Sequence, residues 1–170
     1  MAKIYLGLGS NQEPRIDYLR TGERYIQQFI GEIVNRSSDY ETDPWGVKDQ
    51  PSFINNVIEV ISFHNPHVIL SSIEKIEYSM GREKGRKWGE RNIDIDILFY
   101  EEMILESLKL QIPHPYIQER IFVLAPMREI NNMFIHPILK KTIEELYLAS
   151  LDQSAAVSYT HLTLPTICSV

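Results

Sequence analysis

Two acidic residues, Asp94 and Asp96, interrupt an otherwise apolar run from Ile93 to Leu98. The run is typical of a β-strand, in which alternate side chains face opposite ways, so both carboxylates would point from one face with Cα atoms ~6.6 Å apart. Two carboxylates held side by side repel each other unless a cation lies between them or one is protonated. Their oxygens suit Mg²⁺, which takes its other ligands from water and substrate phosphates. From the pair alone, a half-exposed strand with solvated acids is the favoured interpretation.

The segment Gly81–Arg91, directly before this strand, changes that interpretation. It holds three glycines and five basic residues against two acidic ones, in a chain whose net charge is −6. Polyphosphate transfer needs such a segment, because acids hold the metal ion while arginines neutralise the charge of the transferred group. A solvated basic loop that contacts nucleic acid is the alternative, but the neighbouring acids favour phosphate. Trp88 either stacks on a flat ring as a lid or is partly buried against the sheet.

Two further segments combine groups that could bind a ligand. Thr42–Phe53 mixes aromatic and hydrogen-bonding residues, and Asn55 follows it, so a flat polar heterocycle could lie between aromatic faces while an amide contacts its edge. Phe53 could equally be a simple core residue. His114 lies between two prolines with Arg120 six residues on, which suggests a second phosphate contact, although a lone histidine is more often structural.

Composition limits the classes of protein that fit. The chain has 170 residues, of which 44% are hydrophobic and 24% charged, as in an ordinary globular domain. Its single cysteine, Cys168, excludes a disulfide framework and a cysteine-rich zinc site, and a reducing cytoplasmic setting is the default expectation. There is no apolar run near the ~20 residues that a membrane span needs, and Met1–Ser10 lacks the apolar region of a signal peptide. The acidic net charge argues against nucleic acid as the main partner.

The elements that must position these residues follow the order β-α-β-β-α-β. We expect an α+β fold of the ferredoxin-like type, a single domain with additional C-terminal helical elements. The expected strands are Ile4–Leu8, Ile33–Glu41, Phe53–Phe63 and Asn92–Tyr100. The two expected main helices run from Pro14 to Gly31 and from Pro66 to Met80. Toward the C-terminus we expect an extended piece at Leu108–His114, a helical turn from Tyr116 that continues to Ile130, and a last helix at Lys141–Leu148.

The end of the chain differs from the rest. Residues 153–170 contain no charged residue in 18 positions. We expect a domain over residues 1–151 and an atypical tail over 152–170, which is either a short apolar strand, a disordered tail or an extension added by cloning or by an altered reading frame. The last interpretation is favoured, and no function is assigned to the tail.

Near the start of the chain, the segment Gly7–Asn11 follows an expected strand but lacks the third glycine of a dinucleotide-binding fingerprint.

The segment Lys87–Leu98 closely resembles the signature of the 6-hydroxymethyl-7,8-dihydropterin pyrophosphokinase family, whose pattern is basic-x-Gly-x-Arg-x-x-Asp-apolar-Asp-apolar-apolar. Four more landmarks fit in order and spacing: Gly9–Asn11, Tyr40–Thr42, Asp49–Asn55, and Pro113–Pro115 with Arg120. The resemblance covers residues 3–148. It implies a ferredoxin-like enzyme of folate biosynthesis that transfers pyrophosphate from ATP to the pterin hydroxymethyl group and releases AMP.

The resemblance also implies a role for each site residue. Arg82 and Arg91 would be the catalytic arginines, and Asp94 and Asp96 would bind two Mg²⁺ ions. ATP would contact Glu77, Trp88, Ile97, Lys109, Gln111, His114 and Arg120, and the pterin would contact Thr42, Asp43, Trp45, Phe53, Asn55 and Phe122. The expected partners are these two small-molecule substrates, and we expect a cytoplasmic monomer that binds neither nucleic acid nor membrane. A non-catalytic nucleotide-binding module and a metal-dependent phosphohydrolase are the alternatives.

Overall fold

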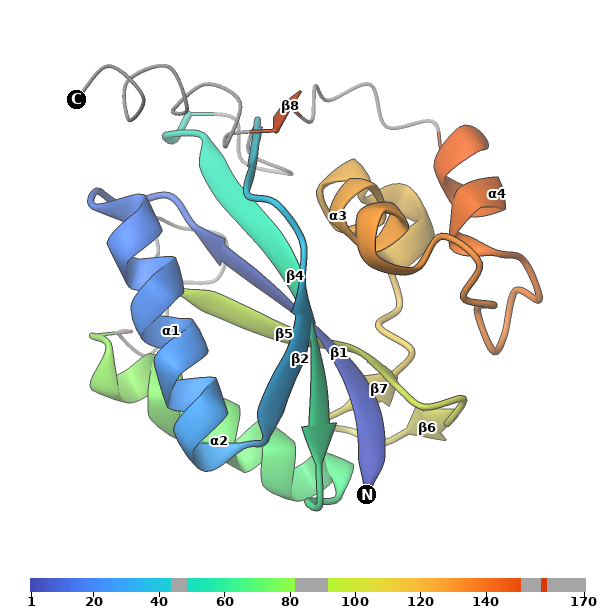
Figure 1. The fold of residues 1–170 in the computed structure, drawn as a ribbon, viewed down its shortest axis with the longest axis horizontal. Coiled ribbons are helices and arrows are strands. Elements are labelled where there is room, and N and C mark those ends of the chain that lie inside the picture. The colour runs from blue at the N-terminus through green and yellow to red at the C-terminus, as the bar shows by residue number, and fades with distance from the viewer. Residues whose placement is uncertain (44–48, 82–91, 151–156, 159–170) are drawn as a thin grey trace.

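The computed structural model describes residues 1–43, 49–81, 92–150 and 157–158. In chain order its elements are β1 (Ala2–Ser10), α1 (Arg15–Phe29), β2 (Glu32–Arg36), β3 (Tyr40–Thr42), β4 (Phe53–Ser62), α2 (Pro66–Ser79), β5 (Asp94–Tyr100), β6 (Leu105–Glu106), β7 (Gln111–Ile112), a 3₁₀ turn (Ile117–Glu119), α3 (Ile121–Asn131), α4 (Ile143–Leu148) and β8 (Val157–Ser158). Figure 1 shows the sheet crossed by α1 and α2 on one side, with α3 and α4 on the other.

The main sheet has the order β5-β1-β4-β3-β8, and β2 also pairs with β4. All of these pairs are antiparallel. This confirms the ferredoxin-like α+β fold with additional C-terminal helices. The central strand β1 is in register with both neighbours, so that Gly9 lies opposite Asn55 on β4 and Asp94 on β5. Since directly opposed residues share a face, these three positions face the same side of the sheet.

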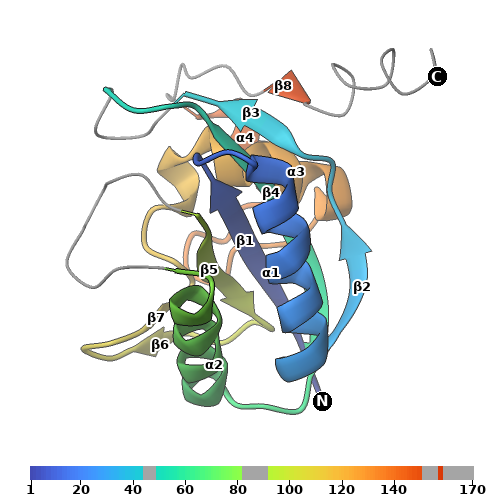
Figure 2. The same cartoon turned by 90° about the vertical axis from the view of Figure 1, so that its left-hand side faces the viewer.

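Helices cover both faces of the sheet (Figure 2). On one face, α1 and α2 bury apolar residues at helical spacing, with Leu19 and Ile26 from α1 and Ile69, Ile73 and Ile76 from α2. These pack on the isoleucines and leucines that β1, β4 and β5 direct to that side. On the other face, α3 and α4 pack on a second core that includes Tyr5, Val57 and Phe99. The sheet alternation places Asp94 and Asp96 on the second face.

Local signals explain where the helices begin. Pro66 is the first residue of α2, and the Asn65 side chain before it accepts a hydrogen bond from the Val68 backbone N–H at 3.1 Å. A reciprocal pair of bonds between Thr142 and Glu145 starts α4. Both helices therefore begin within two residues of the positions expected from the sequence.

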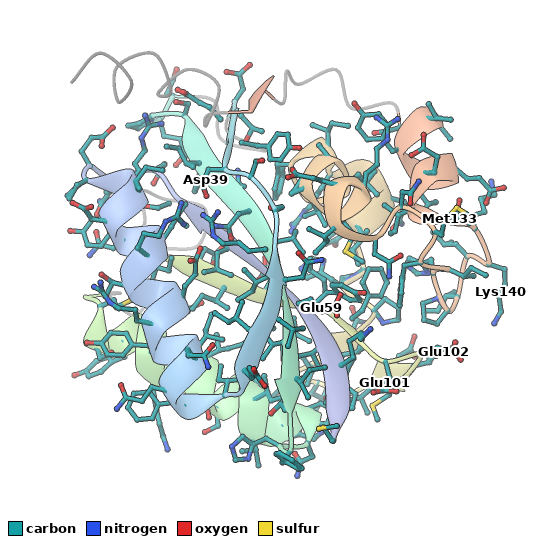
Figure 3. All side chains as sticks on the ribbon, viewed as in Figure 1. Asp39, Glu59, Glu101, Glu102, Met133 and Lys140 are labelled. Carbon is teal, nitrogen blue, oxygen red and sulfur yellow. The ribbon has the colours of Figure 1, made fainter. Side chains whose placement is uncertain are left out.

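A polar cluster divides the expected strand Ile33–Glu41 into β2 and β3. The Asp39 carboxylate between them, labelled in Figure 3, is buried. It accepts hydrogen bonds from Arg20 and Arg36, and also accepts one from Asn56 Nδ2. Burying a carboxylate is costly unless it is paired and hydrogen-bonded, so the chain turns Asp39 toward these cations and leaves the ladder. After the break, β3 resumes pairing with β4 and delivers Thr42 beside Phe53.

The C-terminal region reaches the sheet once within the part of the chain that the structure describes. β8 pairs with β3 at Tyr40 and Glu41. The remainder of the expected tail, residues 151–156 and 159–170, lies outside the described residues. Among the described residues there is no helix long and apolar enough to cross a membrane.

Candidate active site

A cavity of about 400 Å³ lies at the end of the sheet where β1 ends and where β4 and β5 begin. Its walls come from β1, β3, β4, β5, α2, α3 and the segment around His114. Ten of the residues predicted from the sequence line it, namely Thr42, Asp43, Phe53, Asn55, Glu77, Asp94, Asp96, His114, Arg120 and Phe122. The structure therefore brings together residues that lie up to 80 positions apart in the chain.

The strand that carries the two aspartates is held along both edges. On the inner edge, Asp94 and Asp96 pair with Gly9 and Gly7 of β1. On the outer edge, the buried carboxylate of Glu77 on α2 accepts the Ile95 backbone N–H at 3.0 Å. A free edge strand would expose unpaired backbone groups, and Glu77 satisfies one of them between the two aspartates. The carboxylate pair is thus fixed in place by its own backbone.

A buried arginine lies next to this pair. Arg120 Nη1 is 3.9 Å from Asp96 Oδ2, and the arginine side chain is 9% exposed. Burial lowers the pKa of Arg120, while Asp96 and Asp94 raise it. The group remains a cation because a guanidinium keeps its charge in proteins. Its Cζ also lies 5.3 Å from the ring centre of Tyr116 and 5.5 Å from that of Phe122, which orients the planar group.

His114 contributes a neutral hydrogen-bond donor. Burial, together with the positive charge of Arg120, lowers the pKa of His114 to about 4, and Asp94 opposes part of this shift. The Tyr116 backbone N–H donates to His114 Nδ1 at 3.3 Å, so the ring proton is on Nε2. The His114 backbone N–H donates to Leu98 O at 3.0 Å and anchors this segment to β5. At neutral pH the ring can therefore offer an N–H to an anionic ligand without adding charge.

The opposite half of the cavity contains uncharged polar and aromatic side chains. Asn55 Nδ2 donates to Thr42 Oγ1 at 2.9 Å, and both residues are buried. Phe53 and Phe122 are partly buried and line the cavity from β4 and α3. Aromatic faces with a fixed amide between two strands suit a flat heterocycle whose edge carries donors and acceptors.

Residues outside the cavity hold the segment that leads into Phe53. Arg15 at the start of α1 donates to the Ser52 backbone O at 3.2 Å, and the Ser52 hydroxyl donates to Glu41 at 2.8 Å. Asn11 Nδ2 donates to Gln50 Oε1 at 3.1 Å. Sequence pattern alone gives no role to Arg15 or Gln50, because their contacts depend on how the chain between the end of β1 and the start of α1 packs beside the beginning of β4.

Other predicted residues lie elsewhere. Ile97 is buried in the core under α1 and α2, and Lys109 and Gln111 are exposed around β7. None of these three is among the residues that line the cavity. Four more, Trp45, Arg82, Trp88 and Arg91, lie outside the described residues. Within the described ranges no group of three or more acidic, histidine or cysteine side chains is gathered as a metal site, so the site offers a carboxylate pair.

A ferredoxin-like sheet with a carboxylate pair, a buried arginine and an aromatic pocket in one cavity suits an enzyme that transfers phosphoryl groups to a small molecule. Residues 5–132 match the model of the 7,8-dihydro-6-hydroxymethylpterin-pyrophosphokinase (HPPK) family, and the chain belongs to that family. It is 39% identical over 145 residues to the 2-amino-4-hydroxy-6-hydroxymethyldihydropteridine pyrophosphokinase of Aquifex aeolicus. The match covers 85% of this chain and 90% of that protein. It is 41% identical over 127 residues to the enzyme of the same name from Bacillus subtilis, covering 74% of this chain and 76% of that one.

Solved structures share the fold at low sequence identity. An HPPK-DHPS structure from Plasmodium falciparum matches with a TM-score of 0.71 and 20% identity, over 87% of this chain and 43% of that chain. This chain thus spans less than half of that protein. The folic acid synthesis protein fol1 of Schizosaccharomyces pombe is also longer: the match, 37% identical over 142 residues, covers 83% of this chain but 19% of fol1.

Proposed function

We propose that this cavity transfers the pyrophosphoryl group of ATP to the hydroxymethyl group of 6-hydroxymethyl-7,8-dihydropterin, the reaction for which the family is named. The observation that carries the assignment is the union of two unlike halves in one cavity. The Asp94–Asp96 side suits a polyphosphate, and the Phe53–Asn55 side suits a flat heterocycle. A phosphohydrolase or a nucleotide-binding module would need the first half alone.

The transfer is an in-line displacement. The pterin hydroxyl oxygen forms a bond to the β-phosphorus of ATP, the bond from that phosphorus to the α–β bridging oxygen breaks, AMP leaves, and the hydroxyl proton is released to solvent. In this proposal Arg120 neutralises charge on the phosphate oxygens and the Nε2–H of His114 donates a hydrogen bond to them, and both interactions stabilise the transition state. Phe53, Phe122 and Asn55 orient the acceptor, since holding two reactants in line supplies a large share of such catalysis.

Asp94 and Asp96 are the residues that would hold Mg²⁺, and two ions are expected. The donor set fits, because two hard carboxylates on one strand face leave the remaining positions to water and substrate phosphates. When bound, the ions supply positive charge to the phosphate oxygens. Arg82 and Arg91 are proposed as the arginines that follow the transferred group. Glu77, Trp88, Ile97, Lys109 and Gln111 are proposed for the ATP side, and Asp43 and Trp45 for the pterin side.

We further propose that residues 1–151 act as one pyrophosphokinase domain, that the protein is a cytoplasmic monomer, and that the tail over 152–170 has no part in the reaction. An active variant truncated after Leu151 supports the last point. Loss of activity on truncation, with the fold retained, contradicts it.

Nucleotide product analysis tests the function. The protein is incubated with ATP and Mg²⁺, with and without 6-hydroxymethyl-7,8-dihydropterin, and the nucleotides are separated. AMP that forms only in the presence of the pterin is the expected result. ADP and phosphate formed regardless of the pterin would indicate a phosphohydrolase, and saturable ATP binding without any product would indicate a binding module.

A further inference from the structure

Gly9, at the end of β1, leaves a space that the side chain of Asn55 fills. A Cβ atom built on Gly9 would lie 2.5 Å from Asn55 Oδ1 and 3.7 Å from Phe53 Cδ1. The first distance is far inside van der Waals contact, whereas the second is ordinary contact. Gly9 does not have the left-handed φ that favours glycine, so any residue could adopt its backbone conformation. Glycine is needed here for space alone.

The side chain that occupies this space is fixed at its other end. Asn55 Nδ2 donates to Thr42 Oγ1 at 2.9 Å, and Asn55 is 7% exposed. With the nitrogen directed to Thr42, the oxygen is directed back over β1, where Gly9 lies opposite Asn55 in the ladder. The carboxamide is therefore held between a hydroxyl on β3 and bare backbone on β1.

We propose that Gly9 is a positioning residue for the heterocycle half of the cavity, and that the missing side chain at this position sets the orientation in which Asn55 meets the substrate edge. This inference rests on the proposed function, because it takes the pterin as the ligand of Asn55. It adds a residue that has no side chain and acts through its neighbour.

The geometry separates this role from a role in folding. The atom that a Cβ on Gly9 would displace is the tip of a short side chain that borders the cavity, so Asn55 can rotate away while the backbone stays. Gly31 is the opposite case, since a Cβ there would lie 2.2 Å from the backbone O of Ile61. Replacing Gly31 would strain the fold, whereas replacing Gly9 would disturb the orientation of one amide.

Gly7 offers a matched control on the same strand and the same face. A Cβ on Gly7 would lie 3.4 Å from Leu98 Cδ1, which is ordinary contact. Gly7→Ala and Gly9→Ala therefore make the same chemical change and the same change in strand propensity, two residues apart. Only Gly9→Ala forces Asn55 to move.

The test is a double-mutant cycle on pterin binding. Wild type, Gly9→Ala, Asn55→Ala, the double variant and Gly7→Ala are titrated with 6-hydroxymethyl-7,8-dihydropterin in the presence of Mg²⁺ and a non-hydrolysable ATP analogue. We expect Gly9→Ala to raise the pterin Kd by roughly tenfold to a hundredfold, the cost of an unmade hydrogen bond to a buried polar group. The Kd of the ATP analogue and the Tm should stay near wild type, and Gly7→Ala should change the pterin Kd by less than about threefold.

The cycle also tests whether the effect of Gly9→Ala on the pterin Kd acts through Asn55. In the Asn55→Ala background, adding Gly9→Ala should leave the pterin Kd within about twofold, because the group through which Gly9 acts is gone. Equal losses in both backgrounds, equal losses for Gly7→Ala and Gly9→Ala, or a Gly9→Ala protein that fails to fold even with Asn55→Ala would each overturn the proposal. Failure of the proposed function has a different signature, since the wild type itself would then not bind the pterin.

Discussion

The two halves of the cavity are positioned in different ways. On the half proposed for the phosphates, the charged groups of Asp94 and Asp96 project from a strand whose backbone is held by β1 on one edge and by Glu77 on the other. On the heterocycle half, the orientation of Asn55 depends on a single side-chain bond to Thr42 and on the space above Gly9. The positions of the two carboxylates are thus set by backbone hydrogen bonds, whereas the orientation of the Asn55 amide is set by side-chain contacts.

The difference follows from how the two interactions vary with distance. Coulomb energy falls slowly with separation, so a small shift of a carboxylate or of Arg120 leaves most of the interaction intact. A hydrogen bond weakens steeply once its distance and angle leave a narrow range. The phosphate half should therefore fail when a charge is removed, and the heterocycle half when a neutral neighbour changes size.

The largest effect should come from the carboxylate pair. Asp94→Asn and Asp96→Asn keep the shape of each side chain and remove its charge, and each should lower kcat by at least about 10²–10³-fold. AMP formation with both substrates is the measurement. Glu102→Gln, an exposed residue at the far end of the sheet (Figure 3), is the control for a lost negative charge and should retain activity. Turnover retained in both aspartate variants would remove the metal assignment.

Arg120 should come next. Arg120→Ala removes the cation beside Asp96 and should lower kcat/KM for ATP by about 10²-fold. Arg120→Lys keeps the charge, loses the planar group over Phe122, and should recover part of this loss. Arg128→Ala removes an exposed arginine on α3 and serves as the control. If Arg120→Ala changed only the KM of the pterin, Arg120 would belong to the heterocycle half of the cavity, and its assignment to the phosphate half would be wrong.

The outer edge of β5 gives a smaller effect that tests backbone fixation directly. Glu77→Leu leaves the Ile95 N–H without its acceptor and should lower the free energy of unfolding by about 1–3 kcal/mol. Glu77→Gln retains an oxygen that can accept this bond and should cost less than about 1 kcal/mol. Chemical denaturation of the two variants measures the difference, and equal losses would argue that the carboxylate charge, rather than the backbone bond, holds the strand.

The smallest effect concerns pH. Because the pKa of His114 falls from 6.5 to about 4 in the folded protein, the unfolded chain binds the extra proton first, and stability falls as pH is lowered from 6.5 to 4. After allowance for solvent screening of this partly exposed group, its share is about 1–2 kcal/mol. His114→Gln should flatten the dependence of the unfolding free energy on pH in that window. An unchanged slope would assign the acid sensitivity to other groups, of which buried His136, whose pKa burial also lowers, is one.

Those parts of the fold that depend on local sequence patterns could be predicted, and those that depend on contacts between distant elements could not. The alternation around Asp94 and Asp96 and the apolar faces of α1 and α2 are local patterns, and they predicted the strand, the helices and the ferredoxin-like order correctly. The division of the second strand at Asp39 was not predictable, because its partners Arg20 and Asn56 come from other elements. A carboxylate leaves a strand only when folding brings cations to it.

The site shows the same limit. A motif can name Asn55 and Glu77, but it does not contain the 3.0 Å bond from Ile95 to Glu77 or the 2.5 Å approach to Gly9. The first depends on the packing of a helix 18 positions away in the sequence, and the second depends on the register of β1 with β4. Glycine in a landmark such as Gly9–Asn11 is easily taken as a turn signal, and only the neighbouring strand reveals that its role is space.

The register of β1 has one more consequence, which concerns substrate length. Gly9 lies directly between Asn55 and Asp94, one strand away from each. Neighbouring strands are about 4.8 Å apart, so the backbones that carry the amide and the first acid are separated by roughly 10 Å. That span is set by backbone hydrogen bonds and does not adjust with loops. An alcohol whose hydroxyl lies one carbon farther from the ring would meet the phosphate out of line, and the sheet itself would select against it.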